Sequence, residues 1–189
     1  MLAEQAVLTP EAVKRDVERF YDNTAPSYDR LYGEEQKAKY TTVLNMVEPV
    51  EGPILDAGCG TGLLFTELKD AEIVGVDISM GMLREAARKT RGKKHIHLVR
   101  CDIEELPLRS ETFTACLSFT VAQNLPRAWK AFSELLRVAE PGGTIAVTFR
   151  ENGVKSEDLK VLKLSGLKSS KLGKEEIDLG FKPLRRLNL

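Results

Sequence analysis

Three glycines follow an acidic residue at every second position in Asp56-Ala57-Gly58-Cys59-Gly60-Thr61-Gly62. The apolar pair Ile54-Leu55 comes directly before this motif, which predicts a buried strand that ends in a tight loop. Glycine lets a backbone take positive φ angles and approach a ligand more closely than a Cβ would permit. We therefore expect this loop to hold a small molecule at the carboxyl edge of a parallel sheet.

The loop departs from two common nucleotide-binding patterns. The dinucleotide pattern G-x-G-x-x-G needs a third glycine where Leu63 stands, and the phosphate loop G-x-x-x-x-G-K-S/T is also missing. The missing glycine disfavours an NAD-linked reductase. Asp56, at the front of the motif, is a poor partner for a pyrophosphate and suits a ligand that carries an ammonium group.

The segments around this loop alternate between strand and helix patterns. We expect strands at 54–56, 73–77, 95–100, 113–119 and 144–149, helices at 62–68, 79–90 and 126–139, and a turn at 141–143. This alternation predicts an α/β fold: a doubly wound Rossmann-like sheet, mostly parallel, with helices on both faces. Beyond it, a helix at 156–164 and strands at 166–172 and 181–189 predict an antiparallel sheet edge.

The N-terminal segment predicts a helical lid. A helix begins at Thr9-Pro10-Glu11 and breaks at 23–26, a turn follows at 27–33, and a second helix covers 34–47. Three of the four tyrosines lie close together here, namely Tyr21, Tyr28 and Tyr32. Their rings either close over a ligand or pack between the helices.

Taken together, these segments predict a single domain over 1–189. The lid would occupy 1–50, a cofactor-binding core 51–150, and the sheet-edge segment 151–189.

Several motifs in this order resemble the class I S-adenosylmethionine-dependent methyltransferases, in their ubiquinone/menaquinone-type branch. Asp56 to Gly62 resembles the family's first motif, Val74-Gly75-Val76-Asp77-Ile78-Ser79 its second and Arg100-Cys101-Asp102-Ile103 its third. The segment 135–144 resembles the helix, turn and fifth strand of that fold, and 21–32 resembles its lid. The resemblance covers roughly residues 20–149.

The resemblance implies S-adenosyl-L-methionine as cofactor, with Asp77 taking the ribose hydroxyls and Asp102 the adenine amino group. Ile78 and Ile103 would sandwich the adenine. The expected cofactor-binding residues are Tyr28, Asp56, Ala57, Gly58, Gly60, Gly62, Asp77, Ile78, Asp102, Ile103 and Phe119. Other roles stay open for the three acids: Asp77 as a cap for the helix from Ser79, Asp102 as a plain loop acid, and Asp56 as an acceptor for the loop's own amides.

The methyl acceptor is expected to bind after the fourth strand, at Phe119, Thr120, Gln123 and Asn124. The Asn-Pro-Pro-Tyr-type motif of amide and exocyclic-amine methyltransferases is missing there, which disfavours methylation of adenine or glutamine nitrogen. Gln123 and Asn124 either orient the acceptor or cap the next helix, and Phe119 either stacks on a ring or fills the core. No candidate general base stands out, so the catalytic residues stay unassigned.

The amino-acid composition limits which binding partners and cellular settings we expect. Lys plus Arg (28) equals Asp plus Glu (28), so no global charge favours DNA or an anionic membrane, although the last 39 residues carry a local excess of three positive charges. We find no membrane-spanning run and no secretory signal, and the scattered Cys59, Cys101 and Cys116 indicate a reducing, cytoplasmic setting. Cys59 is expected to pack rather than react. His95 and His97 lack a third ligand at metal-binding spacing, so we expect no metal.

Two functions stay open. The first is a methyltransferase that acts on a small molecule or on RNA. The second is a protein of the same fold that binds the cofactor but serves as a non-catalytic scaffold or regulatory subunit. Product formation would separate the two, and a partner subunit fits either.

Overall fold

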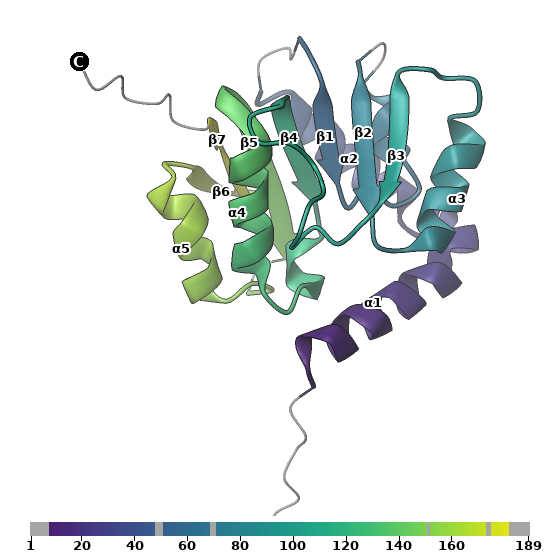
Figure 1. The fold of residues 1–189 in the computed structure, drawn as a ribbon, viewed down its shortest axis with the longest axis horizontal. Helices are drawn as coiled ribbons and strands as arrows, with labels where there is room; N and C mark the ends of the chain where they lie inside the picture. Colours follow the sequence, from purple (N-terminus) through teal and green to yellow (C-terminus); the bar gives the residue numbers. More distant parts are fainter. Residues whose placement is uncertain (1–7, 48–50, 69–70, 151, 173–174, 182–189) are drawn as a thin grey trace, which may run out of the picture.

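The computed structural model describes residues 8–47, 51–68, 71–150, 152–172 and 175–181. In this part of the chain the strands form one sheet in the order β3-β2-β1-β4-β5-β7-β6 (Figure 1). The strands are β1 (Ile54–Ala57), β2 (Ile73–Asp77), β3 (Ile96–Arg100), β4 (Phe113–Phe119), β5 (Ala139–Arg150), β6 (Lys168–Leu172) and β7 (Glu175–Phe181). Strands β1 to β5 are parallel, and β7 and β6 add an antiparallel edge beside β5, which confirms the predicted α/β class.

Helices cover both faces of the sheet because alternate strand residues point to opposite sides. The helices are α1 (Pro10–Thr24), α2 (Tyr28–Leu44), α3 (Met80–Lys89), α4 (Ala128–Val138) and α5 (Ser156–Leu164), with 3-10 turns η1 (Ala25–Ser27), η2 (Leu63–Thr66) and η3 (Ala122–Asn124). On one face Leu55 packs with Phe132 of α4 and Leu162 of α5. On the other, Ile54 packs with Val43 of α2.

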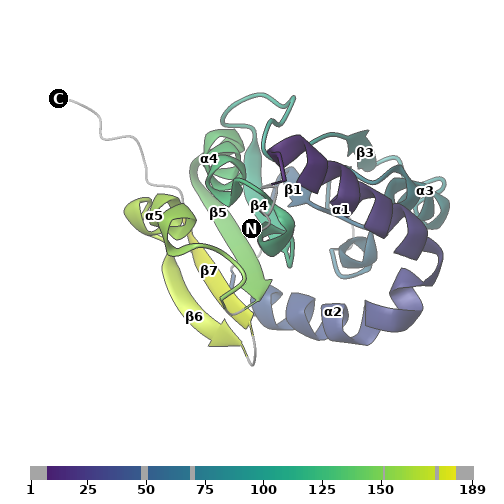
Figure 2. The same ribbon diagram turned by 90° about the horizontal axis from the view of Figure 1, so that it is seen from below.

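Helix α1 lies across the carboxyl ends of the parallel strands, as the two ribbon views show (Figures 1 and 2). The expected start of the helix is confirmed: the Thr9 hydroxyl accepts a hydrogen bond from the Ala12 amide at 3.2 Å, and Pro10 occupies the first turn. The fold thus places the N-terminal segment directly over the edge where the glycine loop emerges.

Two predicted segments near this edge were wrong. The helix expected at 62–68 is only the short turn η2, which starts from Gly62 in a left-handed conformation (φ 73°). Leu63, Leu64 and Phe65 are all buried, so this segment lacks the polar face that a longer surface helix would need. The turn expected at 27–33 is also wrong, because α2 already starts at Tyr28, and α2 ends at Leu44 rather than at residue 47.

One further prediction failed in the C-terminal half. The turn expected at 141–143 lies within β5, whose pairing with β4 is irregular there: Phe113 pairs with Ala139, but Ala115 pairs with Thr144. Gly142 (φ 83°) absorbs the extra length as a bulge. The sequence did not predict β7, and the strand expected at 181–189 lies, beyond Phe181, outside the described part of the chain.

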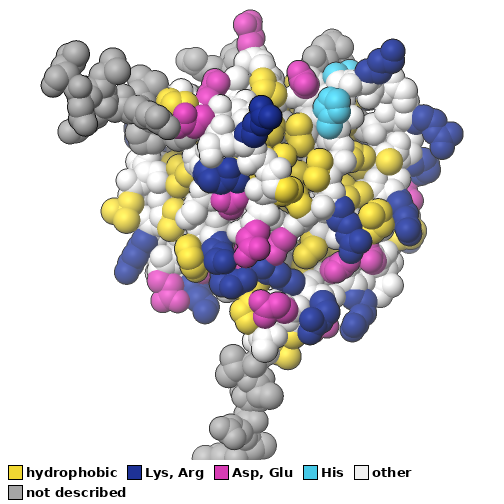
Figure 3. Space-filling view, in the orientation of Figure 1, with side chains coloured by type: hydrophobic (Ala, Val, Ile, Leu, Met, Phe, Trp, Pro, Cys, Tyr) yellow, Lys and Arg dark blue, Asp and Glu magenta, His cyan; other side chains and the backbone are white. Residues whose placement is uncertain are grey.

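In the described part of the chain, no helix is both long enough and apolar enough to cross a membrane. On the face seen in Figure 3, Lys and Arg side chains are interspersed with Asp and Glu rather than gathered in one patch.

Candidate functional site

The glycine loop takes the strained backbone that its sequence predicts. Gly58, Gly60 and Gly62 all have positive φ angles, of 83°, 52° and 73°. A Cβ at Gly58 would lie 2.3 Å from Cγ2 of Val121, whereas a Cβ at Gly60 would meet no atom within 4 Å. The loop therefore packs tightly on one side and faces open space on the other, as a ligand cradle requires.

Asp77, at the carboxyl end of β2, holds this loop in place. One carboxylate oxygen accepts a hydrogen bond from the Gly60 amide at 2.9 Å, and the other accepts one from the Ser79 amide at 2.8 Å. The cap of α3 is Ser79 itself, whose hydroxyl accepts from the Met82 amide at 3.1 Å. Burial raises the pKa of Asp77, although the backbone hydrogen bonds oppose that rise.

A mostly apolar pocket, which we call the inner pocket, lies between this edge of the sheet and α1. Four residues expected at the cofactor line it from the lid, the loop and β2: Tyr28, Gly58, Gly60 and Asp77. Four more expected residues line it from the neighbouring loops: Ile78, Asp102, Ile103 and Phe119. The space along this lining amounts to about 720 Å³ when the solvent at its open mouth is included. Asp56, Ala57 and Gly62 lie behind this lining rather than on it.

Lys14 of α1 ties the lid to the far wall of this inner pocket. Its ammonium lies 2.5 Å from a carboxylate oxygen of Asp102 and 2.6 Å from one of Glu104. Burial opposes the charge of Lys14, but its hydrogen bonds to both carboxylates outweigh that effect and raise its pKa. The Glu104 side chain is fully buried and also accepts from the Arg127 amide at 2.8 Å.

Two more contacts hold α1 on the strand ends. Glu18 pairs with Arg100 at the end of β3. Asp22 accepts from the Ser79 hydroxyl at 2.6 Å and from the Gly81 amide at 2.7 Å. The helices approach so closely at Gly81 that a Cβ there would lie 2.9 Å from Cα of Asp22. The lid is therefore held by charged and polar groups rather than by a buried apolar face.

Replacing Lys14 by methionine should loosen this lid. The variant leaves Glu104 buried with one partner fewer, which we expect to cost about 1–3 kcal/mol of unfolding free energy. Amide hydrogen exchange should accelerate in α1 while β1 and β4 stay protected. Lys37→Met is the matched control, because Lys37 is exposed and, of the described acidic residues, pairs with Glu34 alone, at 3.9 Å. Equal exchange in the two variants would contradict the role given to Lys14.

Asp56 is buried behind the glycine loop, at 3% exposure. Burial, and secondarily the charge of Asp77, raise its pKa to about 8. At neutral pH the free protein thus holds a neutral carboxyl group here, which a nearby cation would ionise.

This burial predicts a pH dependence of stability. The folded state keeps the Asp56 proton up to about pH 8, whereas the unfolded chain loses it near the ordinary value of 3.8. Stability should therefore fall as pH rises between these values, by roughly 2 kcal/mol from pH 6 to pH 8. Asp56→Asn should remove that part of the slope in denaturant titrations. An unchanged slope in the variant would show that Asp56 is already ionised when folded.

A second space, which we call the outer chamber, adjoins the inner pocket. It shares Tyr21, Tyr28, Thr120 and Asn124 with that pocket. Its other lining residues are Phe20, Tyr32, Glu35, Gln36, Gln123 and Arg150. The structure thus brings the three lid tyrosines together with three of the four residues expected at the acceptor. Thr120 lies there in a left-handed conformation (φ 59°) that non-glycine residues rarely adopt.

The fourth acceptor candidate, Phe119, has a double role. Its ring packs edge-on against Tyr40 of α2 with the ring centres 4.8 Å apart, and it also lines the inner pocket. The N-cap position of α4 is Arg127 rather than Gln123 or Asn124. The Asn124 amide instead donates to the Tyr21 hydroxyl at 3.0 Å, which fastens the lid over the end of β4.

Sequence reasoning missed several lining residues. Lys14 and Val17 of α1 had no recognisable signal, because their positions depend on contacts far along the chain. Arg150 could have been found, since it ends the fifth parallel strand, and such strand ends line sites in open α/β sheets. Cys59 was expected to pack and does so, beside Phe65.

The chain resembles known proteins in both sequence and fold. Residues 55–147 match a family model described as a methyltransferase domain. A ubiquinone/menaquinone biosynthesis C-methyltransferase of Syntrophotalea carbinolica is 34% identical over 70% of the chain, and a demethylmenaquinone methyltransferase of Roseiflexus is 34% identical over 74%. The matches cover 60% and 63% of these two relatives, so the chain spans less than two thirds of their length. Among solved structures, the (4+2)-cyclase SpnF has the same fold, with a TM-score of 0.77, 18% identity and coverage of 90% of this chain and 96% of that one.

Proposed function

Since the chain belongs to the class I S-adenosylmethionine-dependent methyltransferases, in the ubiquinone/menaquinone-type branch of its relatives, we propose that it binds S-adenosylmethionine and transfers the methyl group to an acceptor in the outer chamber. One observation carries the proposal: a glycine cradle and a strand-end carboxylate face the same apolar pocket. The substrates of the relatives do not identify the acceptor of this chain. The acceptor therefore has to be inferred from the residues that line its own site.

The residues present fit that cofactor. The empty space beside Gly60 leaves room for a ligand against the backbone. Each Asp77 oxygen accepts one backbone hydrogen bond and keeps a lone pair for a sugar hydroxyl. Ile78 and Ile103 supply apolar walls for a flat base. Asp56, neutral in the free protein, would ionise beside an ammonium group, which agrees with a loop that prefers a cationic ligand.

Asp102 can also accept a further hydrogen bond, here from the adenine amino group. One of its oxygens pairs with Lys14 and the other accepts from the Glu104 amide at 2.9 Å. A carboxylate oxygen can accept more than one hydrogen bond, so Asp102 can also take an amino group while Lys14 holds its orientation.

The bound cofactor would supply an activated methyl group. The protein would align the acceptor with that group and exclude water from the site. Tyr21 and Tyr28 lie at the boundary of the two spaces, where they can exclude water and fix the path between donor and acceptor. Lys14, Glu18 and Asp22 hold α1 closed over that path. Asn124 orients the Tyr21 hydroxyl, whose proton then points away from the amide.

A cofactor-binding but non-catalytic role is the second candidate. It is favoured by the lack, among the residues that the structure describes, of an obvious base beside the outer chamber, and a shared fold does not by itself fix the reaction. Another structure of this fold is described as a complex between a methyltransferase activator and its methyltransferase from Haloferax volcanii, so a partner subunit belongs to the same proposal.

Calorimetry tests the cofactor and product analysis tests the chemistry. We expect the chain to bind S-adenosylmethionine and S-adenosylhomocysteine with micromolar affinity and NADH without measurable heat. Transfer of a labelled methyl group from S-adenosylmethionine to a metabolite or RNA pool would establish catalysis. Binding without any labelled product would favour the non-catalytic role, and binding of NADH alone would overturn the proposal.

A further inference from the structure

Aromatic rings form one wall of the outer chamber. Phe20 and Tyr21 lie edge to face with ring centres 5.2 Å apart, Tyr21 and Tyr28 are 6.3 Å apart, and Tyr28 and Tyr32 are 5.0 Å apart. Such a row of rings offers faces and edges to a flat molecule. The Tyr21 hydroxyl lies at the boundary with the inner pocket, so a flat ring against this wall would sit beside the bound cofactor.

Two amide oxygens in the chamber lining have no hydrogen-bond partner among the residues that the structure describes. They belong to Gln36, which is only 5% exposed, and to Gln123. The orientation of the Gln123 amide is fixed, because its nitrogen donates to the Thr120 carbonyl at 2.6 Å. Buried acceptors without donors are rare in native proteins, so these oxygens point to a ligand that carries a hydroxyl or an N–H group.

The charges of the chamber favour an anion. Glu35 is neutralised by Lys39, whose ammonium lies 2.8 Å away. Arg150 lines the chamber and makes no side-chain ion pair or hydrogen bond with any residue in the described part of the chain. Its field nevertheless reaches the chamber walls, since it helps to lower the pKa of Glu35 after the larger effects of Lys39. A guanidinium fork suits the two oxygens of a carboxylate.

From these three observations we propose that the outer chamber binds a small, flat, ring-shaped carboxylate that also carries a hydrogen-bond donor, and that this compound class is the methyl acceptor. The carboxylate pairs with Arg150, the ring lies on the tyrosine wall, and the donor group meets Gln36 and Gln123. This inference rests on the proposed function for its claim of methyl transfer, but the binding claim stands on the chamber alone.

Three probes with one ring test the charge preference: 4-hydroxybenzoate, 4-hydroxybenzyl alcohol and 4-hydroxybenzylamine. They differ in a single substituent that is anionic, neutral or cationic. With the full chain saturated by S-adenosylhomocysteine, ligand-observed NMR titration should show the benzoate binding about tenfold more tightly than the alcohol. The amine should bind more weakly than both. Equal affinities, or tighter binding of the amine, would overturn the proposal.

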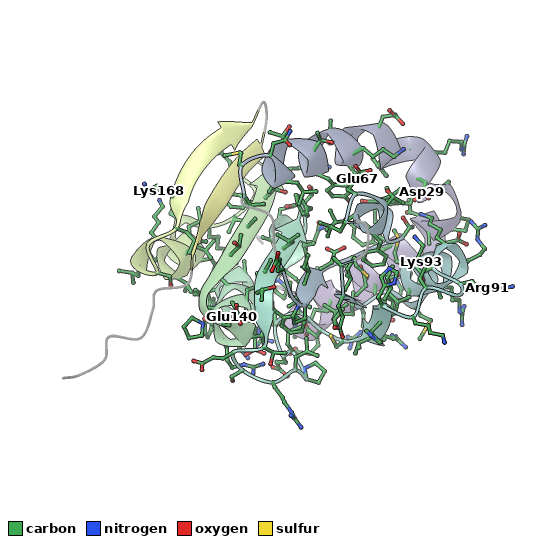
Figure 4. All side chains as sticks on the ribbon, turned by 90° about the horizontal axis from the view of Figure 1, so that it is seen from above. Asp29, Glu67, Arg91, Lys93, Glu140 and Lys168 are labelled. Atoms are coloured by element: carbon green, nitrogen blue, oxygen red, sulfur yellow. The ribbon has the colours of Figure 1, made fainter. Side chains whose placement is uncertain are left out.

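Arg150→Gln identifies the group responsible. This variant should bring the benzoate down to the affinity of the alcohol and leave the alcohol unchanged. Arg91→Gln is the matched control, because Arg91 extends from the turn after α3 into solvent, away from the body of the protein (Figure 4). If both variants weaken the benzoate equally, the effect is general electrostatics and the assignment of Arg150 is wrong.

Gln123→Leu tests the contact with the hydrogen-bond donor of the ligand. The wild-type protein should prefer 4-hydroxybenzoate over benzoate, and the variant should show a smaller preference because only Gln36 still accepts. A preference that is unchanged in the variant would remove Gln123 from the site. Failure of the proposed function gives a different result: S-adenosylhomocysteine would not bind, while the three probes titrated without it would still rank by charge. If the nucleoside binds and the probes do not rank, only the chamber proposal fails.

Discussion

Gly58→Val should lower the affinity for S-adenosylhomocysteine by about a hundredfold or more, the largest loss that we expect from one substitution. A side chain at Gly58 meets Val121 at 2.3 Å, and the φ angle of 83° resists any β-branched residue. The loop can relieve both only by moving, and the same loop forms the floor of the inner pocket. Calorimetric titration at equal protein concentration measures the loss.

Gly92→Val controls for backbone strain. Gly92 has nearly the same φ angle, 85°, but a Cβ there would meet nothing within 4 Å, and the residue lies in the turn after α3. Both variants should lose thermal stability through the strained backbone, and only Gly58→Val should lose the ligand. Wild-type affinity in Gly58→Val would show that the loop does not approach the nucleoside.

Asp77→Ala should weaken S-adenosylhomocysteine by more than about tenfold, because two charge-assisted hydrogen bonds to the sugar are lost. The structure adds a cost to folding. Removing the carboxylate also strips the Gly60 and Ser79 amides of their acceptor, so the melting temperature should drop as well. Affinity alone therefore does not distinguish a lost sugar contact from a loosened loop.

A ligand pair separates these two effects. Wild-type protein should bind adenosine more tightly than 2′,3′-dideoxyadenosine, which lacks the sugar hydroxyls. In Asp77→Ala the two nucleosides should bind alike, whatever the overall loss. If the variant still discriminates between them, the sugar hydroxyls contact some other group and the role of Asp77 is structural.

The sequence was most informative where local patterns decide structure. Alternating apolar strands and capped helices predicted the parallel sheet, and the spacing of Gly58 and Gly60 predicted a loop that now borders the inner pocket. Asp77 and Asp102 were placed at strand ends by the same reasoning. The antiparallel edge was also predicted, although strand β7 within it was not.

The remainder depends on contacts between distant segments. The link from Lys14 to Asp102 spans 88 positions, and no local pattern around Lys14 distinguishes it from a surface lysine. Pro141-Gly142-Gly143 has turn chemistry and predicted a turn before the fifth strand. The strand already begins at Ala139, and its pairing with β4 shifts register across these residues. The outer chamber needs four separate segments to meet, so the sequence predicted Thr120, Gln123, Asn124 and the tyrosines there but not Gln36 or Arg150.

A crystal of the protein soaked with S-adenosylhomocysteine tests the central claim most directly. The account predicts the ligand in the inner pocket, with the ribose hydroxyls within hydrogen-bond distance of Asp77 and the base between Ile78 and Ile103. A nucleoside seated elsewhere, or a sugar turned away from Asp77, would contradict it.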